Sequence, residues 1–227
     1  MTDAPEMIVQ VYGVTTPADA AAVNALSPDH IAVVLDEGIE TWDSVDRTTA
    51  RAIASELDDD VKLVALSLST DTARIRRTVD DLEPDILHVA RASQGIGPEG
   101  VASLREELNG IEVMTTVPVR GPEALEIARE LAGCSDYLLL DTVHPDTGIV
   151  GATGYVHDWG VSAGIVQALD VPVVLAGGLG PDNVGEAIRA VRPWGVDSET
   201  RTSLADNRRR KDIDAVRLFL EIARSAG

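Results

Sequence analysis

The feature that most constrains the fold is a regular alternation of short apolar runs with amphipathic segments along the chain. The apolar runs, four to seven residues long, predict strands, and the segments between them have the apolar spacing of helices. Strand and helix alternate eight times, and no linker or low-complexity run interrupts them. Alternating units of this kind require parallel strand pairing. Eight of them over residues 1–227 predict a single-domain α/β protein, a (β/α)8 TIM barrel with an eight-stranded parallel sheet.

The predicted strands are Met7–Tyr12, Ile31–Leu35, Val61–Ser67, Asp85–Val89, Ile111–Val117, Tyr137–Leu140, Val171–Leu175 and Gly195–Asp197. The predicted helices lie near Ala18–Leu26, Arg47–Leu57, Thr72–Leu82, Pro98–Leu108, Pro122–Leu131, Gly160–Leu169, Pro181–Val191 and Ile213–Ala223. In a barrel, functional residues lie on the loops at the carboxyl ends of the strands, so the residues just after each strand are the candidates for a site.

The composition excludes some classes of function. The net charge is −19 at pH 7, and Lys62 and Lys211 are the only lysines in the sequence. Acid excess along the whole chain predicts a halophilic surface, in which salt screens the repulsion between like charges. It disfavours nucleic-acid and membrane partners, which recruit basic patches. No stretch of 18 apolar residues is present, so we expect a soluble cytoplasmic protein.

Cysteine and histidine positions argue against a metal site. Cys134 is the single cysteine, which rules out an internal disulfide and a cysteine metal cluster. The histidines show no metal-ligand spacing, and no nucleophile-elbow pattern surrounds a serine. We therefore expect neither a metal nor serine-hydrolase chemistry.

The run Leu175-Ala176-Gly177-Gly178-Leu179-Gly180-Pro181 joins the seventh predicted strand to the next helix. Adjacent glycines let the backbone approach a ligand, and N–H groups at a helix start favour an anion. Such a turn after strands 7 and 8 of a barrel makes a phosphate cradle. The alternative is an ordinary tight turn between a strand and a helix.

Asp141 follows the apolar run Tyr137–Leu140 and opens the longest loop, which extends to Asp158. A carboxyl at the top of a barrel strand, bordered by apolar residues, has its pKa raised by desolvation and can serve as a general acid. The alternative role is a helix cap or a loop anchor. Gly148, Gly151 and Gly154 would give the loop the freedom to fold over a ligand.

These motifs together resemble the phosphoribosylanthranilate isomerase family of tryptophan biosynthesis. The resemblance is collinear over nearly the whole chain, and it is strongest in the second half. The matching segments are Leu138–Thr142, Gly151–Gly154, His157–Trp159, Leu175–Val184, Pro193–Asp197 and Lys211-Asp212.

The resemblance implies isomerisation of a phosphoribosyl aminoaldose to an aminoketose without a cofactor. The family uses an aspartic acid after strand 6 as general acid and a cysteine after strand 1 as base. Asp141 matches the acid and would protonate the ribose ring oxygen. Gly177 and Gly178 match the first half of the phosphate cradle.

Three places depart from the family pattern. The strand-1 sequence Lys-Ile-Cys-Gly is replaced by Gln10-Val11-Tyr12-Gly13, which puts Tyr12 at the position of the base, as a hydrogen-bond donor or weak acid–base group. The family's arginine after strand 2, which pairs with the anthranilate carboxylate, is replaced by the acidic segment 36–43. After strand 8 a glycine-rich turn is replaced by 198–202, where Arg201 could pair with phosphate.

The sequence thus favours a barrel that binds a small phosphorylated sugar-type metabolite. The main hypothesis is a diverged aldose–ketose isomerase that uses Asp141, Tyr12, Gly177, Gly178 and Arg201. One alternative is genuine phosphoribosylanthranilate isomerase activity with a substitute base. The other is a non-catalytic metabolite-binding or regulatory homologue, because a barrel keeps its fold through wholesale changes in its loops.

Overall fold

The structure is a computed structural model of the chain. It describes residues 7–35, 38–39, 41–108, 110–144, 146, 150–151 and 154–227. Gly148, which the sequence suggested as a source of loop freedom, and Asp36, Glu37 and Glu40 of the acidic segment lie outside the described residues.

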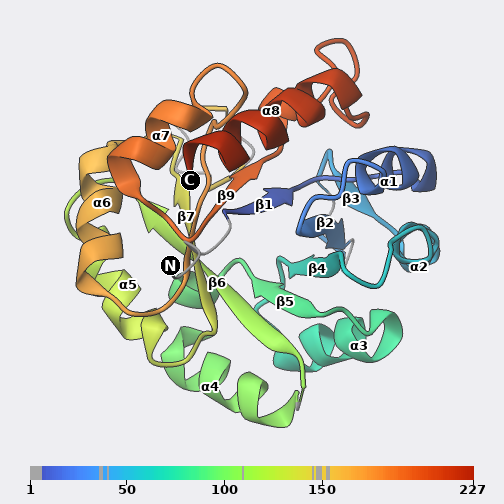
Figure 1. Cartoon of the computed structure of the whole chain (residues 1–227). Coiled ribbons are helices and arrows are strands. Elements are labelled where there is room, and N and C mark those ends of the chain that lie inside the picture. Colours follow the sequence, from blue (N-terminus) through green and yellow to red (C-terminus); the bar gives the residue numbers. More distant parts are fainter. Residues whose placement is uncertain are drawn as a thin grey trace.

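Eight parallel strands form a closed barrel, and one short strand is attached to it (Figure 1). The strands are β1 (Ile8–Val11), β2 (His30–Leu35), β3 (Ser44–Val45), β4 (Lys62–Ser67), β5 (Ile86–Val89), β6 (Glu112–Val119), β7 (Tyr137–Thr142), β8 (Val173–Leu175) and β9 (Gly195–Ser198). The sheet order is β1-β9-β8-β7-β6-β5-β4-β2-β3, and β1 also pairs with β2, which closes the ring. The predicted TIM barrel is confirmed.

The two-residue strand β3 is an element that the apolar pattern did not predict. It pairs in parallel with the end of β2, with Val34 opposite Ser44 and Leu35 opposite Val45. A strand this short has no periodicity to recognise, so only its pairing with β2 defines it.

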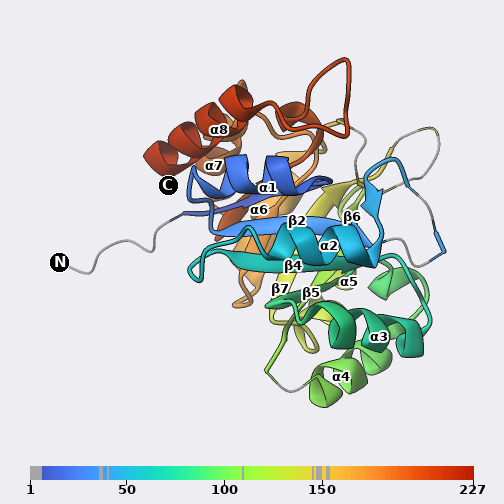
Figure 2. The same ribbon diagram turned by 90° about the vertical axis from the view of Figure 1, so that its right-hand side faces the viewer.

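The helices form the outer layer around the strands, as Figures 1 and 2 show. They are α1 (Pro17–Asn24), α2 (Arg47–Ala54), α3 (Thr72–Leu82), α4 (Gly97–Glu107), α5 (Ala124–Ala132), α6 (Trp159–Ala168), α7 (Val184–Val191) and α8 (Ile213–Ala226). Two short 3-10 helices, η1 (Ala92–Gln94) and η2 (Thr200–Thr202), lie in the loops after β5 and β9. Side chains of Asp46, Asp71, Asp158 and Asp212 accept backbone N–H groups at helix starts, which satisfies donors that have no partner within the helix.

The helix predicted from Pro181 begins three residues later, at Val184, which corrects that expectation. Asn183 causes the difference. Its side chain accepts from the N–H of Gly180 at 2.9 Å and donates to the carbonyl of Gly178 at 3.0 Å. Residues 181–183 are therefore held as a turn, which separates the glycine pair from the first turn of α7.

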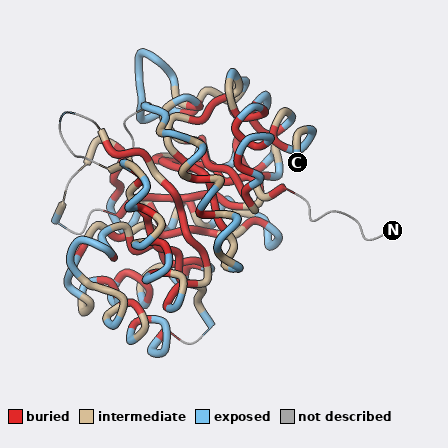
Figure 3. The backbone as a smooth tube through the Cα atoms, turned by 90° about the vertical axis from the view of Figure 1, so that its left-hand side faces the viewer, coloured by how far each residue is buried: buried red, intermediate tan, exposed pale blue. Residues whose placement is uncertain are grey.

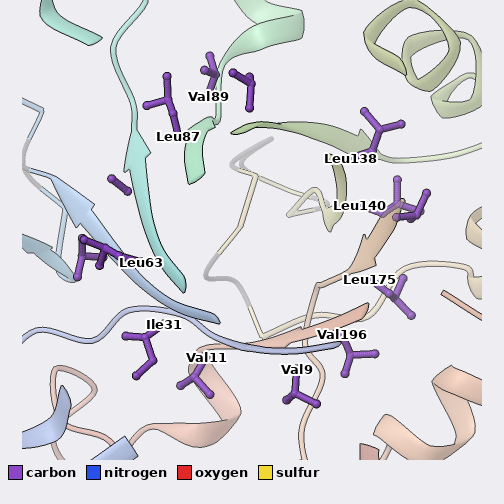
Figure 4. Packing of buried hydrophobic residues seen from close by; sticks show 14 of the residues in the cluster. Val9, Val11, Ile31, Leu63, Leu87, Val89, Leu138, Leu140, Leu175 and Val196 are labelled. Atoms are coloured by element: carbon purple, nitrogen blue, oxygen red, sulfur yellow. The ribbon is translucent and has the colours of Figure 1, made fainter. Parts of the chain in front are cut away.

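Successive side chains of each strand point to opposite faces of the sheet, which gives the barrel two apolar layers. One set of side chains points outward and packs against the helices. Val9, Ile31, Leu87, Leu138 and Val196 belong to this set (Figure 4). The other set points into the barrel and includes Val64, Ile86, Met114, Leu139 and Val174. Figure 3 shows the resulting buried centre beneath helices that are exposed on one side. Successive strand residues face opposite sides, so each strand supplies both layers.

Aromatic side chains fill the end of the barrel at which the strands begin. Tyr137 and Trp194 stack with ring centroids 5.0 Å apart, and His30 lies edge-on to Tyr137 at 6.4 Å. Lys62 pairs with Glu112 at 2.5 Å, and the Tyr137 hydroxyl donates to Glu112 at 2.7 Å. These contacts leave the opposite end, where the strands finish, for a ligand.

No helix among the described residues is long and apolar enough to cross a membrane. The same residues contain no group of three or more histidine, cysteine, aspartate or glutamate side chains arranged to hold a metal ion.

Leu138 provides a test of the outward layer. It is fully buried between β7 and the helices, so Leu138→Ala removes apolar contacts and leaves a cavity. We expect the free energy of unfolding to fall by about 2–5 kcal/mol in urea titrations at high salt. Leu218→Ala on α8, where the side chain is 48% exposed, should change it by no more than about 0.5 kcal/mol. Equal losses in the two variants would contradict the packing described here.

Candidate active site

A cavity of about 820 Å³ opens at the carboxyl ends of the strands. Part of its lining is apolar and includes Val34, Ile39, Leu66, Leu68 and Leu139. Its remaining lining is mostly polar. A cavity that combines apolar walls with a few placed polar groups is typical of a small-molecule site.

Among the described residues, four carboxyl groups line this cavity, and they come from different parts of the chain. They are Asp43, Asp141, Asp197 and Glu199. Two arginines also line it. The Arg208 guanidinium lies over the Trp42 ring, 4.4 Å from its centroid, and Arg91 follows β5. The cavity therefore has an acidic centre and cations on its lining.

Asp141 lies near the end of β7, with its carboxyl facing the cavity. Its Oδ1 accepts the backbone N–H of Thr142 at 2.7 Å, and its Oδ2 lies against Gly151. Desolvation by burial raises its pKa from the usual value to about 6, although the Thr142 hydrogen bond acts in the opposite direction. A carboxyl with such a pKa can exchange a proton near neutral pH.

Tyr12 follows β1 and reaches across the barrel to β5. Its hydroxyl lies 2.7 Å from Nδ1 of His88, and Nε2 of His88 lies 2.7 Å from the hydroxyl of Thr116. Burial lowers the pKa of His88 to about 3, so the ring is neutral at physiological pH. Burial, together with nearby carboxylates, raises the pKa of Tyr12 well above its usual value. Tyr12 is therefore a protonated hydrogen-bonding group in the floor of the cavity.

Asp197 lies on β9, opposite Gln10 of β1 in the strand register. Gln10 donates from Nε2 to Oδ1 of Asp197 at 3.3 Å, and its Oε1 lies 3.1 Å from Nδ1 of His30. Burial, followed by repulsion from Asp141, raises the pKa of Asp197 to about 8. His30, Gln10 and Asp197 thus form a column of polar groups inside the barrel, from the end where the strands begin to the cavity.

Glu199 follows β9 and packs against the backbone of Gly13. Burial and the neighbouring Asp43 raise the pKa of Glu199 well above its usual value. Lys211, which is buried, donates from Nζ to the Glu199 carbonyl at 3.2 Å and to the Ser203 hydroxyl at 3.1 Å. This lysine balances part of the negative charge at the rim of the barrel.

The glycine turn lies beside these carboxyl groups. Gly177 and Gly178 both have positive φ, +85° and +61°, a region that L side chains rarely adopt. A Cβ on Gly178 would lie 2.6 Å from the Tyr155 carbonyl oxygen. A small cavity of about 30 Å³, lined by the glycine pair, Asp141, Asp197 and Glu199, lies at this turn. It is about the size that holds one water molecule.

A chain of hydrogen bonds anchors the loop that covers the turn. The Thr142 hydroxyl lies 2.8 Å from Nδ1 of His157, and Nε2 of His157 lies 2.6 Å from the hydroxyl of Ser162. Thr142 also contacts Gly177, where a Cβ would collide with its side chain. The end of β7, the start of α6 and the glycine turn are thereby fixed relative to one another.

The structure brings four of the five predicted residues to the cavities. Tyr12 lines the large one, Gly177 and Gly178 line the small one, and Asp141 lines both. Arg201 lies outside their linings, and its guanidinium pairs with Asp182 at 2.7 Å.

Asp197, Glu199 and Arg208 are cavity residues to which sequence reasoning gave no role of their own. Strand alternation offered a signal for Asp197, because in Gly195–Ser198 it faces the side opposite Val196. No sequence signal places Arg208 over Trp42.

A closed parallel barrel with titratable carboxyls and a glycine turn at the strand ends defines a (β/α)8-barrel protein with its candidate site at the carboxyl ends of the strands. The family model described as N-(5'phosphoribosyl)anthranilate (PRA) isomerase matches residues 12–221. The chain belongs to this family.

Curated relatives with the name N-(5'-phosphoribosyl)anthranilate isomerase support this assignment. The protein of Haloferax volcanii is 34% identical over 218 residues, which cover 96% of this chain and 93% of the relative. That of Haloarcula marismortui is also 34% identical over 218 residues, with 96% of each chain covered. Both relatives are haloarchaeal, in keeping with the acidic composition.

Solved structures agree on the fold. The phosphoribosyl anthranilate isomerase of Thermus thermophilus superposes with a TM-score of 0.80 at 23% identity, covering 97% of this chain and all of that one. A second isomerase of this type, with a TM-score of 0.78 at 23% identity, was solved in complex with reduced 1-(o-carboxyphenylamino)-1-deoxyribulose 5-phosphate. The superposition covers 96% of this chain and 99% of the isomerase chain.

Gly178 tests the turn. Gly178→Ala puts a Cβ into a left-handed conformation and against the Tyr155 carbonyl. We expect the free energy of unfolding to fall by about 1–3 kcal/mol in urea titrations. The matched control is Gly164→Ala in α6, where the new methyl group meets open space. That change should raise stability by about 0.5–1 kcal/mol. A neutral Gly178→Ala would show that the turn tolerates a side chain.

Proposed function

We propose that this protein catalyses the PRA isomerase reaction, in which a phosphoribosylated arylamine in the aldose form becomes the aminoketose. The observation that carries the proposal is the position of Asp141. Its carboxyl has a pKa raised toward neutrality and lines both the large cavity and the small cavity at Gly177 and Gly178. Membership of the PRA isomerase family supports the same reaction.

In this proposal the substrate spans the two cavities. The phosphate lies at the Gly177-Gly178 turn, where backbone N–H groups can bind an anion. The small cavity of about 30 Å³ does not hold a phosphate group, so the covering segment at Gly154 and Tyr155 withdraws when the ligand binds. Arg201 would reach the phosphate after leaving Asp182.

The aromatic ring of the substrate would lie against apolar residues of the large cavity, such as Leu66 and Leu68. Its carboxylate needs a cation, and the acidic segment after β2 does not provide one. Arg208, held over Trp42 on the same cavity, supplies that charge in our proposal. Planar guanidinium groups bind carboxylates with two hydrogen bonds, which would also orient the ring.

Asp141 then acts as the proton donor. It protonates the ribose ring oxygen, the bond from that oxygen to C1 breaks, and the nitrogen lone pair forms an iminium. Tyr12, as a protonated donor, would hold a substrate oxygen rather than remove a proton from carbon. Only protons move in this reaction, so it requires no cofactor.

A second candidate is isomerisation of a different phosphorylated aldosylamine. Four carboxyl groups face the large cavity, and they favour a substrate with less negative charge than PRA. Turnover of an aldosylamine that lacks the carboxylate, with none of PRA, would support this candidate. Binding of phosphorylated sugars without any turnover would instead support a non-catalytic role.

Asp141→Asn tests the proposed reaction. Asparagine keeps the shape of the side chain but cannot donate the acid proton. PRA turnover, followed as loss of substrate fluorescence in high salt, should therefore fall by about 10²–10⁴-fold. Asp146→Asn, an exposed position in the same loop, makes the same chemical change and should leave the rate unchanged. Full activity in Asp141→Asn would contradict the assigned role.

Arg208→Ala tests recognition of the substrate carboxylate. Loss of a charge-assisted hydrogen-bonding pair should raise KM for PRA by about 10–100-fold, while kcat changes less. Arg217→Ala on α8, which removes an arginine from an exposed pair with Asp214, is the control and should leave KM unaltered. An unchanged KM in Arg208→Ala would show that the carboxylate binds elsewhere.

A further inference from the structure

The proposed reaction needs a second proton-transfer group. After the sugar ring opens, a base must remove the proton on C2 so that the double bond can move. Tyr12 does not suit this step, because its buried hydroxyl is hydrogen-bonded to a neutral His88 and its pKa is raised well above the usual value. Cys134 lies between α5 and β7, outside the linings of both cavities.

Within the described part of the chain, Asp197 and Glu199 are the carboxyl groups that line the same two cavities as Asp141. Of these two, Asp197 lies within β9 itself, opposite Gln10 of β1. The strand register fixes this arrangement, because β9 pairs with β1 on one side and with β8 on the other, and β8 in turn pairs with β7. The Asp197 side chain is 7% exposed, so little bulk water competes for its carboxylate.

A hydrogen-bonded column beneath Asp197 sets its orientation. The amide of Gln10 has its oxygen toward Nδ1 of His30 and its nitrogen toward Oδ1 of Asp197. With the proton of the His30 ring on Nδ1, the carboxamide has one orientation, in which its N–H group faces Asp197. Gln10 is uncharged, so it positions the carboxyl without holding it permanently in the ionised form.

We propose that Asp197 is the catalytic base that removes the C2 proton and, with Asp141, forms a carboxyl pair that carries out both proton transfers. This inference rests on the proposed function. Glu199 is less suitable, because it lies beside Asp43 and packs against Gly13.

The proton balance closes over one turnover. Asp141 gives its proton to the ring oxygen, and the iminium forms at C1. Asp197 takes the proton from C2, and the electrons of that C–H bond form the C1–C2 double bond while the iminium electrons return to nitrogen. Asp197 then delivers its proton to C1, and Asp141 accepts the proton of the C2 hydroxyl. The ketose is released, and both groups regain their starting states.

The working form of the pair carries one proton. Desolvation, together with repulsion from Asp141, raises the pKa of Asp197 to about 8, above the value of about 6 for Asp141, so the single proton rests mainly on Asp197. The reactive form is the minor one in which that proton lies on Asp141 and Asp197 is ionised. Other titratable groups near Asp197 are Tyr12, Glu199, Asp43 and Lys211. Lys211 acts in the opposite direction and favours the ionised form of Asp197. The pair, rather than either residue alone, thus defines the two limbs of a bell-shaped profile.

Asp197→Asn is the first variant to measure. We expect kcat for PRA to fall by about 10²–10⁴-fold, with KM little changed and the acid limb of the pH profile lost, because no carboxylate base remains to be protonated. With substrate deuterated at C2, the isotope effect on kcat should be larger in Asp197→Asn than in the wild type, because removal of that proton becomes slower. A purely structural role would lower activity without changing the isotope effect.

Gln10→Lys is the second variant, and it keeps the test decisive if Asp197→Asn fails to fold. A cation in place of the amide favours ionised Asp197, so the alkaline limb should move to lower pH by about 1–3 units. Glu112→Gln removes a carboxylate from the opposite end of the same barrel and should leave both limbs in place. The folding of each variant is checked by circular dichroism.

The outcomes separate this inference from the proposed function. Wild-type turnover of PRA with an equally active Asp197→Asn overturns the role of Asp197 and leaves the proposed function standing. An alkaline limb that does not move in Gln10→Lys also overturns it. A folded wild-type protein without turnover contradicts the proposed function, and the role of Asp197 falls with it.

Discussion

The closure of the parallel barrel is the constraint on which the rest of the structure depends. β1 pairs with both β2 and β9, so the first and last strands become neighbours although they are far apart in sequence. This closure leaves one interior, which only side chains can fill. Because the strands are parallel, all their carboxyl ends meet at one rim, and the residues that follow them gather around a common cavity.

The same closure accounts for the unusual electrostatics of the rim. Carboxyl groups that would titrate near pH 4 in water are brought together where water is scarce, and burial raises the pKa of Asp141, Asp197 and Glu199. Lys211 and Arg208 come from the loop before α8 and provide the nearby positive charge. An acidic surface therefore surrounds an acidic centre, but the negative charge is compensated differently in the two places. Salt screens the surface charge, whereas within the barrel protons must balance the charge.

Particular residues show how far sequence reasoning extends. The eight apolar runs predicted the barrel strands because aliphatic side chains in a parallel sheet leave a strong local pattern. Asp141 and the glycine pair were found because each lies just after the apolar run of a predicted strand. The start of α7 was wrong by three residues, because the side chain of Asn183 bonds to the turn before the helix, a contact that Pro181 does not reveal. The position of Arg201 beside Asp182 and that of Arg208 over Trp42 depend on loops that meet only in three dimensions.

The sequence by itself determined the alternation of strands and helices, the family and the residues at the ends of the strands. These follow from local periodicity and from motifs that are contiguous in the chain. Only the tertiary structure decided which of those residues share a cavity and in which protonation state. Tyr12 reaches His88 across the barrel, and Asp197 meets Gln10 through the pairing of the first and last strands. The physical reason is that desolvation and charge repulsion depend on distances between atoms remote in sequence, which barrel closure alone sets.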